Sequence, residues 1–138
     1  MKKGLALLLC VGLALTALAG PVSNLALAIL TLGAFRIIYS YVPYFPGINW
    51  ILNFLIETSM LTVGLGVFNL IPIPPLDGSK ILSELLPPSM AWKFDNLVGR
   101  YGFYILIALV FTGITGAIIR PLAAGYMMLV NGILGLVF

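Results

Sequence analysis

The chain has 138 residues, of which 62% are hydrophobic and 8% are charged, whereas a soluble domain carries about 25% charged residues. Its net charge of +3 comes from basic residues scattered along the chain, and nucleic-acid binding needs them clustered on one face. The composition therefore excludes an ordinary soluble domain and a nucleic-acid-binding protein, and it predicts a protein embedded in lipid.

The first predicted element is a segment without formal charge over residues 4–35. As one helix it would be about 48 Å long, while the hydrocarbon layer of a membrane is about 30 Å thick. Pro21 removes a helical hydrogen bond, so we predict a helix over about 4–41 that is kinked near Gly20 and Pro21. The N-terminal lysines and the apolar run also resemble a secretory signal peptide. However, the run continues to Ile38, whereas polar chain normally follows a cleaved signal.

Residues 39–49 contain prolines, a glycine and several aromatic residues, which predicts a loop at a membrane interface. The next apolar segment predicts a second helix over about 48–70, because the residue before Pro72 is pushed out of helical geometry. Glu57 is the only charged residue in this helix. An ionisable residue at that depth indicates either a functional site or a side chain that is hydrogen-bonded or reaches the interface.

The segment from Ile71 to Gly78 has the sequence Ile-Pro-Ile-Pro-Pro-Leu-Asp-Gly. Its prolines exclude a helix and favour an extended, polyproline-like backbone. Such a backbone cannot face lipid, because its carbonyl groups would have no hydrogen-bond partners there. We therefore expect this segment to pack against protein or to line a wet cavity.

The remaining chain predicts a short helix over about 79–86, an amphipathic interfacial segment over 89–100 and two apolar helices over about 101–119 and 121–138. The last helix either spans the membrane or lies partly in it. The sequence thus predicts one all-α integral membrane domain over 1–138. It has three to four transmembrane helices, with the extended Pro-rich segment between the second and the third.

The basic residues predict an orientation if the first, second and 101–119 helices each cross the membrane once. One side then holds Lys2, Lys3, Lys80, Lys93 and Arg100, and the other side holds Arg36 and Arg120. Because basic residues favour the cytoplasmic side, we expect the N-terminus and the Pro-rich segment to face the cytoplasm.

Three polar residues could carry chemistry. An ionised Asp77 at membrane depth would need a metal, a cation or water as a partner, although aspartate is also a favoured helix N-cap. Asn69 could bind carbonyl groups at the end of the second helix. Asn24 could satisfy the backbone that Pro21 leaves free, or it could face a substrate. The residues themselves leave these alternatives open.

Two motifs resemble those of the site-2 protease family of intramembrane zinc metalloproteases. Residues 69–78 match the family's N-x-x-P-x-P-x-L-D-G motif, with Pro75 at a variable position as in many small bacterial members. Residues 20–24 match its G-P-x-x-N motif. The resemblance covers about residues 15–138, and the longer motif is the specific one.

The resemblance implies a role for each matching residue. Asp77 would be the carboxylate ligand of a catalytic Zn²⁺ ion. Asn24 would hold the backbone of a membrane-anchored protein substrate. The other residues that the resemblance assigns to substrate binding are Asn69, Pro72, Pro74 and Leu76, and those it assigns to the structural motifs are Gly20, Pro21 and Gly78.

One family motif is missing. The family's H-E-x-x-H helix supplies two zinc ligands and the general base, and this chain has no histidine. We therefore assign no catalytic residue to the chain and predict that it is inactive alone. Three explanations remain open: a misassigned start or truncated gene, a degenerate relative, or one half of a split protease.

The function we predict is that of a fragment or degenerate member of the intramembrane zinc metalloendopeptidases. When complete, such an enzyme would hydrolyse membrane-anchored proteins. The alternative is a non-catalytic membrane protein that binds transmembrane partners. The expected partners are lipid, a transmembrane substrate and a missing N-terminal half or partner chain, and the expected location is a bacterial inner membrane.

Overall fold

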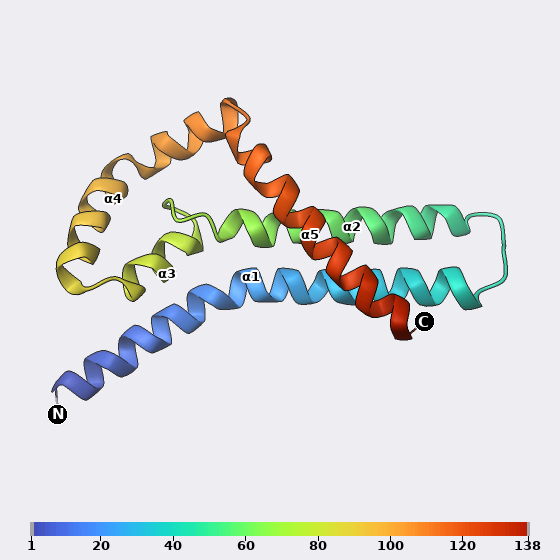
Figure 1. Ribbon diagram of the computed structural model, residues 1–138, viewed down its shortest axis with the longest axis horizontal. Helices are drawn as coiled ribbons and strands as arrows, with labels where there is room; N and C mark the ends of the chain where they lie inside the picture. The colour runs from blue at the N-terminus through green and yellow to red at the C-terminus, as the bar shows by residue number, and fades with distance from the viewer. Residues whose placement is uncertain (1, 138) are drawn as a thin grey trace.

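A computed structural model describes residues 2–137, and helices account for nearly all of this range (Figure 1). The helices are α1 (Lys2–Tyr41), α2 (Ile48–Asn69), α3 (Asp77–Leu85), α4 (Pro88–Phe111) and α5 (Ile114–Val137). No strand occurs between residues 2 and 137. Four of the helices, all but α3, are long and apolar enough to cross a membrane. The prediction of an all-α membrane fold is confirmed.

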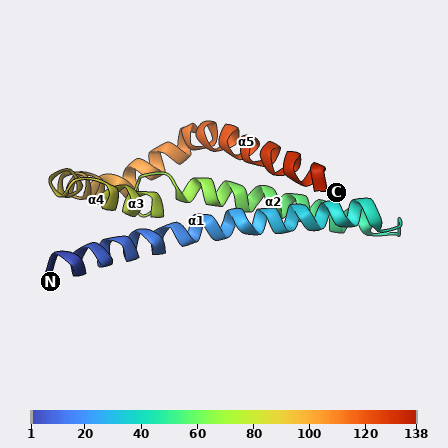
Figure 2. The same ribbon diagram turned by 60° about the horizontal axis from the view of Figure 1, so that its bottom comes forward.

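Helices α1 and α2 form an antiparallel hairpin, and α5 crosses over it (Figures 1 and 2). The hairpin core is built from small and branched side chains, including Ala28, Leu32 and Val63, each at most 1% exposed. The buried Ser59 hydroxyl donates a hydrogen bond to the Ala28 carbonyl oxygen at 3.2 Å. Small residues and interhelical hydrogen bonds of this kind hold helices together where the surrounding lipid is as apolar as the side chains.

The outer surface is rich in large apolar side chains. Leu30, Phe54 and Leu61 are each more than 60% exposed, and they point away from the hairpin core. A soluble protein rarely exposes contiguous apolar surface on this scale. With four helices of spanning length, this surface is that of a multi-pass membrane protein.

Helix α1 contains Pro21 and is bent between its dark-blue and light-blue parts (Figure 1). The missing N–H of a proline removes one helical hydrogen bond, which is a usual cause of bends. Pro21 is fully buried, and a Cβ atom on Gly66 of α2 would lie 3.3 Å from the Pro21 carbonyl oxygen. The bend therefore lies at a point of close contact between α1 and α2.

The Pro-rich segment is not the extended ribbon that its composition predicts. Its prolines leave only Ile73 and Leu76 with backbone N–H groups between residues 72 and 76. Both donate locally: Ile73 to the Ile71 carbonyl oxygen at 2.8 Å and Leu76 to the Ile73 carbonyl oxygen at 3.0 Å. These bonds fold the segment into turns, and Leu76 at its end is extended.

The predicted boundaries of the last helices need correction. The chain breaks at Gly113 rather than at Arg120, so α4 joins the amphipathic 89–100 segment to the start of the apolar run. Gly113 has a φ of +75°, a left-handed conformation that glycine adopts without strain. Pro121 lies inside α5, where its cost is limited to one hydrogen bond and one local adjustment. Helix α3 also begins at Asp77, two residues earlier than expected.

Arg36 and Arg120 were expected at the same end of the protein, but they lie at different depths. The Arg36 guanidinium donates hydrogen bonds to the backbone oxygen and side-chain oxygen of Asn131 on α5, at 3.1 and 3.3 Å. Arg120 lies on α5 itself, about 16 Å nearer the start of that helix than Asn131 does, and it is beside Met60 of α2. Only Arg36 therefore marks the end that carries the α1–α2 loop.

Candidate functional site

Asp77 is the first residue of α3 and follows the Pro-rich segment directly. Its side chain is 31% exposed, and its Oδ1 atom accepts a hydrogen bond from Lys80 Nζ at 3.3 Å. The N-cap position belongs to Leu76, and no side chain caps the helix. Asp77 therefore does not cap α3. The helix dipole nevertheless stabilises a carboxylate in the first turn.

The carboxyl group of Asp77 lies against Gly20 of α1. A Cβ atom built on Gly20 would lie 3.0 Å from Asp77 Oδ2. Glycine therefore leaves the space that this carboxylate occupies. The fold brings together residues from the two sequence motifs, which are far apart in the chain.

A groove of about 320 Å³ opens beside this contact, between α1 and α3. It is lined by Leu13, Thr16, Ala17, Asp77, Lys80 and Glu84. Glu84 was not predicted as a site residue. It could have been found from its spacing, because seven residues are about two helical turns and place it on the same face as Asp77. Pro21 also leaves the carbonyl of Ala17 without its helical donor, which adds an acceptor beside the groove.

Asn24 and Asn69 are both half-buried. Asn24 lies one helical turn after Gly20 on the same face of α1. Asn69 is the last residue of α2, where the carbonyl oxygens of Val67 and Phe68 accept hydrogen bonds from the backbone N–H groups of Leu70 and Ile71. Neither asparagine side chain has a hydrogen bond within residues 11–137, where side chains are described. Their amides are therefore not committed to the local backbone.

The predicted substrate-binding residues of the Pro-rich segment lie in different surroundings. Pro72 is exposed and, with Ile71, lines an apolar hollow of about 450 Å³ whose other walls come from α1, α2 and α5. Tyr126 of α5 closes one side and donates a hydrogen bond to the Leu25 carbonyl oxygen at 2.7 Å. Pro74 and Leu76 instead pack within the protein, and Leu76 is only 8% exposed.

Two glycines fix the position of the Pro-rich segment. A Cβ atom on Gly78 would overlap the carbonyl group of Leu70, and one on Gly102 of α4 would lie 2.9 Å from Pro74 Cδ. Gly78 was predicted from the motif, but Gly102 was not assigned a role. Its only signal in the sequence is a single glycine between two aromatic residues, Tyr101 and Phe103.

The residues present do not form a zinc site by themselves. Among residues 11–137, whose side chains the structure describes, no group of three histidine, cysteine, aspartate or glutamate side chains is close enough to hold a metal ion. A catalytic zinc ion takes three protein ligands and keeps a fourth position for water. Asp77 and Glu84 beside the groove offer carboxylates but no imidazole, so this donor set is incomplete.

The helices, the two converging motifs and the carboxylate at the end of the Pro-rich segment define a multi-pass membrane protein of the site-2 protease type. The profile of Peptidase family M50 matches residues 44–112, half of the chain. The chain belongs to peptidase family M50.

The chain is also similar to three bacterial proteins. YwhC of Bacillus subtilis strain 168, provisionally named a zinc metalloprotease, is 30% identical over 113 residues, or 78% of this chain and 50% of YwhC. Rip2 of Mycolicibacterium smegmatis, also provisionally named so, is 35% identical over 100 residues, or 71% of this chain and 36% of Rip2. Zinc metalloprotease RasP of Oceanobacillus iheyensis is 53% identical over 30 residues, or 22% of this chain and 7% of RasP.

The chain therefore spans half or less of the length of these relatives. No solved structure matches it.

Proposed function

We propose that this chain is the C-terminal part of an intramembrane zinc metalloendopeptidase. Asp77 would supply one carboxylate ligand to the zinc ion, and residues outside this chain would supply the two imidazoles and the general base. The observation that carries the proposal is the contact between Asp77 and Gly20, because it joins the two motifs into one site beside an open groove. When bound, the zinc ion would supply a water activated for peptide hydrolysis.

The chain's own residues would position the substrate. The carbonyl oxygens of the exposed Pro72 and Pro75 are not used by other backbone groups among the described residues, so they can accept hydrogen bonds from an unwound substrate segment. The uncommitted Asn24 amide would hold the substrate backbone from the α1 side. Pro72 and the apolar hollow beside it would receive a hydrophobic side chain.

The second candidate is a non-catalytic membrane protein that binds transmembrane partners through the same surfaces. The incomplete donor set around Asp77 favours it, and the apolar hollow next to Pro72 would serve a binding protein equally well. Zinc binding separates the two candidates, because only the first requires that the Asp77 carboxylate become part of a complete ligand set.

The zinc content of two purified proteins tests the proposal. The chain alone, in detergent, should hold far less than one zinc ion per molecule after dialysis, because a single carboxylate cannot retain the ion. A chimera with an N-terminal membrane segment that carries H-E-x-x-H should hold about one ion per molecule, as measured by atomic absorption. A folded chimera without zinc would refute the metalloprotease assignment, and tight stoichiometric zinc on the chain alone would refute the proposed ligand sharing.

We also propose that the chain lies in a bacterial inner membrane with its N-terminus in the cytoplasm. The end of the protein opposite the α1–α2 loop holds Lys80, Lys93 and Arg100, whereas the loop end holds Arg36. Basic residues favour the cytoplasmic side of a membrane, which supports this orientation. In a Cys10→Ala background, a Tyr44→Cys variant should react with a membrane-impermeant maleimide added to intact spheroplasts. A Trp92→Cys variant should react only after lysis, and the opposite pattern would reverse the orientation.

A further inference from the structure

One face of α4 carries two basic residues that no other part of the described chain uses. Lys93 and Arg100 are seven residues apart, which is about two helical turns, so they lie on the same face, with Asn96 between them. Neither has a hydrogen bond or ion pair with any side chain of residues 11–137, the range over which side chains are described. By contrast, Arg36 and Lys80 have partners within the chain.

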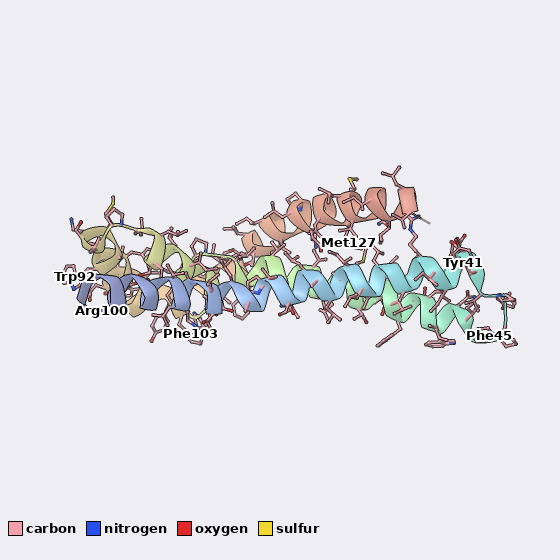
Figure 3. The ribbon with its side chains drawn as sticks, turned by 90° about the horizontal axis from the view of Figure 1, so that it is seen from below. Tyr41, Phe45, Trp92, Arg100, Phe103 and Met127 are labelled. Atoms are coloured by element: carbon pink, nitrogen blue, oxygen red, sulfur yellow. The ribbon has the colours of Figure 1, made fainter. Side chains whose placement is uncertain are left out.

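The same face is shaped as a shallow hollow between aromatic residues. A space of about 440 Å³ is lined by Trp92, Lys93, Asn96, Leu97, Arg100 and Tyr101. Trp92 and Tyr101 are 69% and 50% exposed, and they lie at opposite edges of this surface. Figure 3 places Trp92 and Arg100 at the end of the protein opposite Tyr41 and Phe45. The two cations thus lie between two amphipathic rings.

The acidic residue on this part of α4, Asp95, does not face the hollow. Asp95 lies on another side of the helix, and its Oδ2 atom accepts a hydrogen bond from the Ser83 hydroxyl at 2.8 Å. No acidic residue lines the hollow. The surface is therefore positive overall and fits an anionic group.

The position of this surface along α4 indicates that the anion belongs to a lipid. No charged residue occurs from Tyr101 to Phe111, and Phe103 and Tyr104 in this stretch are exposed, so the helix enters apolar surroundings directly after Arg100. Tryptophan and tyrosine favour the headgroup level of a membrane, and basic residues at this level attract anionic lipids. A soluble acidic partner would not account for the apolar stretch that follows.

From these contacts we propose that Lys93, Arg100 and the flanking Trp92 and Tyr101 form a binding site for the phosphate headgroup of an anionic phospholipid. The two cations bind the phosphate, and the indole and phenol rings hold the glycerol region at the membrane surface. The site is separate from Asp77 and does not depend on the proposed peptidase function.

Trp92 itself provides the measurement, because the chain has only two tryptophans and Trp50 lies near the α1–α2 loop. A Trp50→Phe chain is reconstituted into phosphatidylcholine vesicles, and part of the lipid is replaced by brominated phosphatidylglycerol or brominated phosphatidylcholine. The brominated phosphatidylglycerol should quench Trp92 fluorescence preferentially. Lys93→Gln and Arg100→Gln should each reduce this preference about fivefold, because each removes the attraction of one basic residue to an anionic surface.

Lys80→Gln is the matched control, because it removes one positive charge at the same end of the protein but outside the hollow. It should leave the preference for phosphatidylglycerol unchanged. Equal quenching by the two brominated lipids in the parent chain would overturn the proposal, and so would an equal loss in the control. Loss of the preference on adding polyglutamate at constant ionic strength would instead identify an acidic protein as the ligand and overturn the lipid assignment.

Discussion

Replacing Asp77 by asparagine in the chimera that carries H-E-x-x-H should remove its zinc and its peptidase activity. The side chain keeps its shape and its place against Gly20, but it loses the charge that a zinc ligand needs. Outer-shell substitutions around zinc lower metal affinity about 10- to 100-fold, so loss of a direct ligand should exceed about 100-fold. Metal affinity is measured by competition with a chelator, and activity with a fluorescent transmembrane peptide.

The matched control is Glu84→Gln, which removes a carboxylate from the same groove but seven residues from Asp77. It should retain about one zinc ion per molecule. If the two variants lose zinc equally, the groove acts only through its total charge, and Asp77 is not a specific ligand. Retention of zinc by the Asp77→Asn chimera would show that the ligand assignment is wrong.

Among substitutions near the site that add one methyl group, Gly78→Ala should destabilise the protein most. The added Cβ atom would overlap the carbonyl of Leu70, so the backbone at the end of α2 or the start of α3 must move. Overpacking of a well-packed interior costs about 1–3 kcal/mol, and more when backbone is displaced. We expect a loss of about 3 kcal/mol, measured as the free energy of unfolding in mixed detergent micelles followed by circular dichroism.

Gly99→Ala provides the control for this measurement. A Cβ atom on Gly99 would meet nothing within 4 Å, and this residue lies inside α4. Alanine should stabilise the helix there by up to about 1 kcal/mol. If Gly78→Ala behaves like Gly99→Ala, the tight passage between α2 and α3 is not present in the folded protein.

The helices could be predicted from the sequence because lipid leaves few alternatives for a long apolar segment. The hairpin of α1 and α2 follows from two such segments joined by a loop with prolines. A short helix after the prolines also followed, although it begins at Asp77, two residues earlier than expected. The bend in α1 could likewise be placed from Pro21 alone. In each case the signal is local to the residues concerned.

The break between α4 and α5 was misplaced because two local signals compete. Pro121 was expected to end a helix, but a spanning helix tolerates a proline when its other residues stay paired. Gly113 adopts a left-handed conformation instead, and a glycine in an apolar run gives no sign of this. The turns of the Pro-rich segment were missed for a similar reason, since they depend on which of its few donors find acceptors.

The tight contacts around the site also could not be predicted from the sequence. Gly20, Gly66 and Gly102 meet atoms of other elements, whereas Gly64 and Gly116 face open space. All five lie in similar apolar surroundings in the sequence. Which glycine faces a neighbour depends on how each helix is rotated about its axis, and that rotation is decided by packing across the whole bundle.

Under the proposed function, the turns at residues 72–76 would have consequences for selectivity. The N–H groups of Ile73 and Leu76 donate hydrogen bonds within the segment. The edge formed by these turns, here called the rim, therefore presents carbonyl oxygen atoms and hardly any free N–H group. A peptide lying along it must offer its own nitrogen-bound hydrogens in return. Imino acids or N-methylated residues at those places would be rejected whatever their side chains, so backbone chemistry would filter the peptides that this rim accepts.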